Sequence, residues 1–112
     1  MATPLNVFKT VTADVTNVNE TVYTAPPGNT GIVLMAQVSN ITETSGTFTF
    51  YHFKSATNTQ TELVKEFLMP GNDATSPVTG KLIIEAGDSI KIVASDNDKF
   101  KLTLSILESL NA

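Results

Sequence analysis

Apolar and polar residues alternate most regularly in the last third of the chain, residues 80–110. An apolar side chain at every second position is the period of a β-strand with one buried and one solvated face. Two polar breaks, residues 85–88 and 96–99, divide this region into successive antiparallel strands. The apolar positions expected to face a core are Ile90, Ile92, Ala94, Phe100, Leu102, Leu104 and Ile106.

The same pattern predicts four earlier strands, over residues 5–12, 15–24, 32–40 and 47–54. Residues 25–30 form a turn, because Pro26 and Pro27 fix φ and Gly28 permits positive φ. Residues 55–61 are predicted to be a polar loop, and residues 70–77 are the longest break in the pattern.

Residues 62–69 are the one segment that also fits a helix. Leu63, Val64, Phe67 and Leu68 fall at helical spacing, but eight residues are few for a helix. Val64, Glu66 and Leu68 also fall at every second position, as residues on one face of a strand do. We favour a strand because the surrounding chain is built of strands.

These elements predict a single all-β domain over residues 1–112, an antiparallel two-sheet sandwich of about eight strands. We expect a jelly-roll-like arrangement. Strand pairing is non-local, so the pattern itself leaves an immunoglobulin-like strand order open.

Composition narrows the possible functions. The chain has no cysteine, which removes disulfides, thiolate chemistry and cysteine zinc sites. The net charge is −4 and the seven basic residues are scattered, so we expect neither nucleic-acid nor membrane binding. The first residues lack the basic and apolar segments of a signal peptide, and no apolar run is long enough to span a bilayer.

Candidates for catalytic or metal chemistry are few. His52 is the one histidine, and we interpret it as a packed or exposed strand residue. No sequence motif of a hydrolase, metalloprotease or phosphate-binding loop is present. The acidic turns at residues 96–98 and 72–73 offer oxygen ligands but fewer than calcium needs, and Asx residues favour tight turns for their own hydrogen bonds. We therefore expect no enzyme activity, metal or cofactor.

Apolar residues on faces expected to be solvated indicate an interaction surface instead. Phe8 lies opposite Leu5 and Val7 on the first strand. The run of residues 32–35 is apolar on both faces, so we expect a loop or another subunit to cover it. The candidate interface residues are Phe8, Val33, Met35, Leu107 and Leu110.

The aromatic strand at residues 47–54 allows two arrangements. Phe48 and Phe50 share one face, and Tyr51 and Phe53 share the other. A bulge near residues 50–51 would bring all four rings to one side, and without it two rings face outward. An exposed Tyr23 or Tyr51 would suit the alternative function, a glycan- or receptor-binding module of a tail or fibre.

Two segments resemble small virion proteins of tailed bacteriophages. The first, residues 22–40, reads VYTAPPGNTGIVLMAQVSN, a tyrosine-threonine-X-proline-X-glycine turn that leads into a hydrophobic strand. The second joins Gly80-Lys81-Leu82 and the turn at residues 85–88 to the closing Leu104-Ser105-Ile106-Leu107-Glu108. The likeness extends over most of the chain from Val22 onward, and its motifs are structural.

The resemblance implies a β-sandwich that assembles on the virion without enzymatic activity. Capsid decoration, often trimeric in such proteins, is the role we expect first, and a neck or tail component is the second. The implied partners are other virion proteins and further copies of the chain, and the implied location is the virion.

Overall fold

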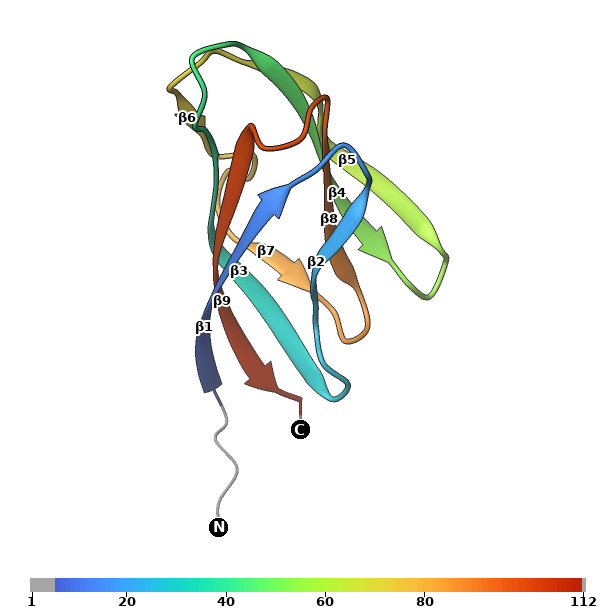
Figure 1. The fold of residues 1–112 in the computed structure, drawn as a ribbon. Helices are drawn as coiled ribbons and strands as arrows, with labels where there is room; N and C mark the ends of the chain where they lie inside the picture. The colour runs from blue at the N-terminus through green and yellow to red at the C-terminus, as the bar shows by residue number, and fades with distance from the viewer. Residues whose placement is uncertain (1–5, 112) are drawn as a thin grey trace.

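The computed structural model describes residues 6–111, which fold into β-strands without a helix among them (Figure 1). The strands are β1 (Asn6–Val15), β2 (Glu20–Thr24), β3 (Asn29–Asn40), β4 (Gly46–Lys54), β5 (Thr59–Met69), β6 (Ala74–Thr75), β7 (Leu82–Ile84), β8 (Ser89–Ala94) and β9 (Phe100–Leu110).

The strands form two antiparallel sheets with a jelly-roll order. One sheet runs β1-β9-β3-β6, with β7 also paired to β3, and the other runs β2-β8-β4-β5. Because β6 and β7 both pair with β3, they act as two pieces of one interrupted edge strand, which gives eight strand positions. The antiparallel sandwich predicted from the sequence is confirmed, and the strand order is that of two Greek keys.

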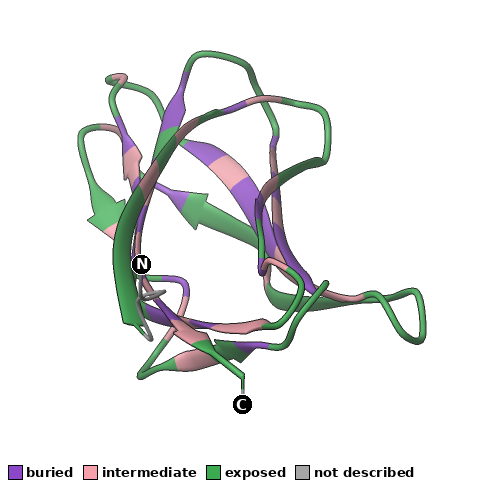
Figure 2. Ribbon diagram, turned by 90° about the horizontal axis from the view of Figure 1, so that it is seen from below, coloured by how far each residue is buried: buried purple, intermediate pink, exposed green. Residues whose placement is uncertain are grey.

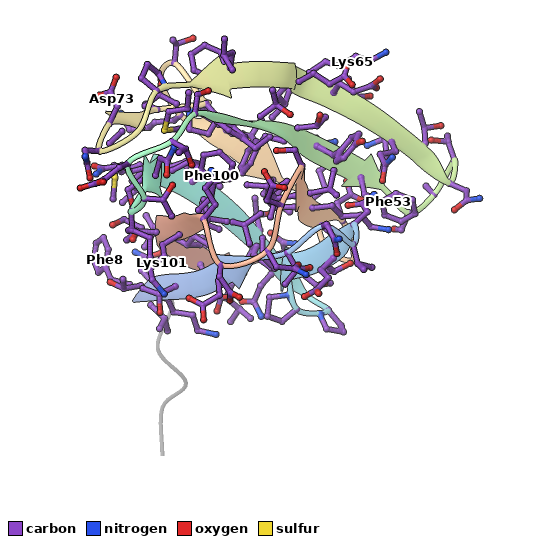
Figure 3. All side chains as sticks on the ribbon, turned by 45° about the horizontal axis from the view of Figure 1, so that its top comes forward. Phe8, Phe53, Lys65, Asp73, Phe100 and Lys101 are labelled. Atoms are coloured by element: carbon purple, nitrogen blue, oxygen red, sulfur yellow. The ribbon has the colours of Figure 1, made fainter. Side chains whose placement is uncertain are left out.

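The core lies between the sheets, and Figure 2 shows buried positions on strands all around the fold. Phe100, Leu102, Leu104 and Ile106 are all buried, as the alternation predicts. Phe100 packs edge-on against Phe48 of the other sheet, with ring centroids 5.8 Å apart, and Figure 3 shows it between the sheets. Alternate residues of both sheets therefore build one shared interior.

The boundaries of the first strands differ from the prediction. β1 extends to Val15 and β2 begins only at Glu20, because the chain turns a corner between the two sheets at residues 16–19. The Thr16 carbonyl accepts a hydrogen bond from Ala94, and Asn17 N–H donates to Asn97 Oδ1 at 2.9 Å. Leu5, expected in the first strand, lies outside the described residues.

The segment at residues 62–69 is a strand, and it extends from Thr59 to Met69 as β5. The expected loop at residues 55–61 therefore shrinks to a turn. The long break at residues 70–77 contains the two-residue strand β6.

β4 keeps its regular alternation, so the second of the two aromatic arrangements is observed. Phe48 and Phe50 are buried, whereas Tyr51 and Phe53 are half-buried on the outer face. The register does shift near Phe50, but the extra residues belong to β5, where Phe67 pairs with Phe48 and Val64 with Phe50. An irregularity in the edge strand leaves the parity of β4 unchanged.

β3 contains a bulge that reverses part of the prediction. Val33 pairs with Ile106 and Met35 with Ser105, so the bulge inserts one extra residue between them. Val33 consequently points into the core with 0% exposure, while Leu34 and Met35 both lie on the outer face. The expectation that Val33 faces outward is wrong, because a bulge changes which parity faces the core.

Candidate interaction surface

Four apolar side chains cross the outer face of the first sheet in one row. Phe8 of β1 lies opposite Leu107 of β9, Leu107 lies opposite Ile32 of β3, and Ile32 lies opposite Ile83 of β7. Directly opposed residues of neighbouring strands point to the same face. Phe8 is 74% exposed and Ile83 52%, and Ile32 and Leu107 are half-buried between them. We call Phe8, Leu107, Ile32 and Ile83 the apolar row.

Figure 3 shows Phe8 at the periphery of the molecule, away from Phe100 in the interior. Leu34 and Met35, turned outward by the β3 bulge, lie next to the apolar row, one step along the strands. Together these six side chains form a continuous apolar surface on a sheet whose other face is the core.

Leu107 points outward because Glu108 points inward. The Tyr23 hydroxyl donates a 2.7 Å hydrogen bond to Glu108 Oε2, and Lys9 Nζ lies 3.2 Å from Oε1. Burial raises the pKa of Tyr23, and the hydrogen bond and negative charge of Glu108 raise it further. With a buried carboxylate compensated in this way, β9 keeps its alternation to the end and presents Leu107 to solvent.

Gly31 makes room for this arrangement. A Cβ atom at position 31 would lie 2.6 Å from the Tyr23 hydroxyl oxygen, which is closer than such contacts occur. Gly31 stands beside Ile32 on β3, so the same short segment supplies the space inside the sandwich and an apolar side chain outside it.

Two shallow hollows flank the apolar surface. One, of about 200 Å³, lies beside Phe8 and is bordered by Thr10, Leu34 and Ser105. The other, of about 230 Å³, lies between Met35 and the β6 residues Ala74 and Thr75. The surface therefore has projecting side chains and depressions of side-chain size.

Charge is nearly absent from this face. In the described strands of the first sheet, only Asp14 and Lys101 bring charge to the outer side, and they pair with each other at 2.6 Å at the end remote from the apolar row. The other outward polar residues of β1, β9 and β3 are uncharged: Asn6, Thr10, Thr12, Thr30, Gln37, Ser39, Thr103, Ser105 and Ser109. The outer face of the other sheet differs, because Lys91 and Glu62 flank Tyr51 there.

The structure places the five interface candidates from the sequence in different environments. Phe8 and Leu107 belong to the apolar row, and Met35 lies beside it. Val33 is in the core. Leu110 is 40% exposed but shares the parity of Glu108, so it lies on the inner side at the open end of the sheet. The sequence reasoning missed Ile32, Leu34 and Ile83, although the four-residue apolar run pointed to this part of β3.

His52 belongs to a separate cluster around Asp88. Asp88 Oδ1 accepts hydrogen bonds from Ser55 N–H at 3.0 Å and Ser55 Oγ at 3.2 Å. The buried Oδ2 has no hydrogen-bond partner among the described residues, and it faces Lys54 Nζ at 3.7 Å and His52 Nε2 at 4.0 Å. Burial raises the pKa of Asp88, but the Ser55 hydrogen bonds and the charges of Lys54 and His52 outweigh it and lower the pKa.

The Asp88 cluster connects neighbouring turns of the sandwich. The Asp88 backbone carbonyl also accepts a hydrogen bond from Ala25 N–H. Asp88 therefore connects the β2–β3 turn and, through Ser55, the β4–β5 turn to the β7–β8 turn in which it lies. The Ser55 hydroxyl is bonded to the carboxylate and not to the imidazole, whereas a serine nucleophile needs a base within hydrogen-bond reach.

Side chains of the acidic turns accept backbone hydrogen bonds. Asn97 Oδ1 accepts from the Asn17 backbone, and Asp73 Oδ1 accepts from Ala74 N–H at 2.8 Å. Within residues 6–111, no three histidine, aspartate or glutamate side chains are grouped as metal ligands. Nor does that part of the chain contain a helix suited to crossing a membrane.

No protein-family model matches the chain, and no curated protein matches it in sequence. A solved structure from Bacillus endospore appendages, described as a novel family of disulfide-linked pili, is similar in fold with a TM-score of 0.57. The alignment covers 96% of this chain and 88% of the other, at 8% sequence identity. The class that the fold defines is an antiparallel jelly-roll β-sandwich. The present chain has no cysteine and so cannot form disulfide links.

Proposed function

We propose that the chain is a non-enzymatic structural protein of tailed-bacteriophage virions, and within this class a capsid decoration protein. The observation that carries the proposal is the apolar row. It is an exposed, uncharged apolar surface on a sheet whose other face is the core, as expected of a protein that works by docking to other subunits. A neck or tail component would use the same surface and is the second role within the class.

The contacts between the two segments that resemble virion proteins support this proposal. Tyr23 of the first segment donates its hydrogen bond to Glu108 of the second, and Ile32 of the first lies opposite Leu107 of the second. The two segments thus form one structural unit, and two of the four side chains of the apolar row belong to it. The resemblance concerns the part of the molecule that builds the exposed surface.

A glycan- or receptor-binding role has less support. Tyr23 is buried and its hydroxyl is engaged by Glu108, so it offers no platform for a sugar. Tyr51 and Phe53 face outward, but Lys91 Nζ lies over the Phe53 ring at 4.4 Å from its centroid and occupies the stacking face.

Peptide mass spectrometry of density-purified particles of the encoding phage tests the proposal. A decoration protein should be present at many copies per particle, in a fixed ratio to the major capsid protein. A neck or tail component should be present at a few copies. Abundant chain in the infected-cell lysate together with none in the particles would overturn the proposed function.

A further inference from the structure

The outer face of the first sheet has the size of a protein interface. β9 has eleven residues. At about 3.4 Å per residue and about 4.8 Å between strands, β1, β9 and β3 cover roughly 35 Å by 14 Å, and the three-residue β7 brings the face to about 550 Å². A stable protein pair buries about 800 Å² on each partner. This face and its rim are therefore large enough for one partner of comparable size.

The charge distribution selects the partner. The chain has a net charge of −4, so two copies repel each other over most of their surfaces. Among the described strand residues on this face, Asp14 and Lys101 carry the charge, and they neutralise each other away from the apolar row. When two copies meet here, the two Lys101 side chains come near each other at one end of β9, and each is neutralised by its own Asp14. A basic partner or an anionic membrane would find no complementary charges.

The apolar row is also self-complementary. A two-fold axis parallel to β9 places β1 of one copy over β3 of the other, and β9 over β9. Phe8 then lies on Ile32 of the second copy with Ile83 beside it, and Leu107 lies near its own equivalent. The projecting Phe8 and the half-buried Ile32 stand on opposite sides of Leu107, as such an isologous contact requires.

We propose that the outer face of the β1-β9-β3-β7 sheet packs against the same face of a second copy of this chain, around a two-fold axis parallel to β9. The inference rests on the proposed assembly role and names the partner of its surface. Face-to-face packing of the sheets, about 10 Å apart, buries the apolar row and the outward side chains of β9, and leaves polar side chains of β1 and β3 such as Asn6, Thr12 and Gln37 nearer the rim.

The mass of the full chain in solution, measured by sedimentation velocity, tests the pairing. The wild type is expected at twice the chain mass of 12.0 kDa. Each copy contributes one Phe8 to the contact, so Phe8→Lys changes the contact at two places. It should raise the dissociation constant of the dimer by at least about 100-fold. Leu68→Lys is the matched control, because Leu68 is 63% exposed on β5 of the other sheet. It should leave the dimer intact, and circular dichroism and urea midpoints should show that both variants fold.

A single introduced cysteine tests the axis. The chain has no cysteine, so Leu107→Cys can link only to the same position of a second copy. Mild oxidation should yield a covalent dimer with Leu107→Cys and far less with Leu68→Cys. A wild type that is monomeric at several hundred micromolar, a trimer, or equal cross-linking of the two variants would each overturn the pairing. A monomeric wild type that is still found on particles would leave the proposed function standing.

Discussion

The Tyr23 hydroxyl in β2 donates a 2.7 Å hydrogen bond to Glu108 Oε2 in β9, and so joins the two sheets through the interior. Both residues are buried, and Lys9 supplies the second partner of the carboxylate. The bond holds Glu108 on the inner face of β9 and thereby directs Leu107 to the outer face. A polar contact inside the sandwich thus sets the position of the apolar surface outside it.

We expect Tyr23→Phe to lower the free energy of unfolding by about 2 kcal/mol, because a buried carboxylate oxygen loses its donor. Urea denaturation followed by circular dichroism measures the change. Tyr51→Phe is the matched control, since Tyr51 lies on the outer face of its sheet, and it should change stability by less than about 0.5 kcal/mol. Equal midpoints for the two variants would contradict the structural role of the Tyr23–Glu108 contact.

Asp88 should make the fold sensitive to acid. Its folded-state pKa lies below the usual 3.8, so ionised Asp88 stabilises the fold above about pH 4. That contribution is lost as the pH falls through the lowered pKa. We expect the urea midpoint of the wild type to decrease as the pH is lowered below 4. Asp88→Asn should be less stable at neutral pH, and its midpoint should decrease less over the same acid range, the acid limb of the stability curve.

The control for the acid experiment is Asp14→Asn, which removes an exposed carboxylate paired with Lys101. Exposed pairs of this kind contribute about 0–1 kcal/mol, so the acid limb should remain. An unchanged acid limb in Asp88→Asn would assign the pH dependence to other groups.

Lys99 should fix the loop between β3 and β4. Its ammonium is buried and donates to Thr44 Oγ1 at 2.6 Å and to the carbonyls of Thr44 and Ser45 at 3.2 Å each. Lys99→Met keeps the length of the side chain but leaves these oxygens unpaired. We expect a loss of about 2 kcal/mol in urea denaturation and faster amide exchange at residues 42–46.

Lys81→Met is the control for Lys99, because it removes an equal charge from an exposed position. Its stability and its exchange at residues 42–46 should match the wild type. Equal losses in the two variants would show that net charge matters and the loop contacts do not.

The fold could be predicted from the sequence wherever strands alternate strictly. In β9 a period of two continues from Phe100 to Glu108, and each inward residue is buried there. The apolar run of β3 carried no such information, because four consecutive apolar residues do not mark a bulge. The sequence pattern therefore predicts the wrong face for Val33.

The candidate surface could be predicted only in part. Phe8 and Leu107 stand out as apolar residues at polar positions, but that they face each other depends on pairing between β1 and β9. Tyr23 and Glu108 are 85 residues apart, so their contact requires knowledge of the sheet order. Ile83 joins the row through a three-residue strand that pairs with β3, which no local pattern signals.

Co-sedimentation of the purified chain with particles of the encoding phage that lack it tests the central claim most directly. The wild type and Leu68→Lys should bind at the same saturating copy number. Phe8→Lys, which cannot pair through the apolar row, should bind with at least about tenfold lower affinity, because it attaches as a single copy and not as a pair with two contacts to the particle. Binding of all three chains with equal affinity, or of none of them, would contradict a virion protein whose assembly depends on this face.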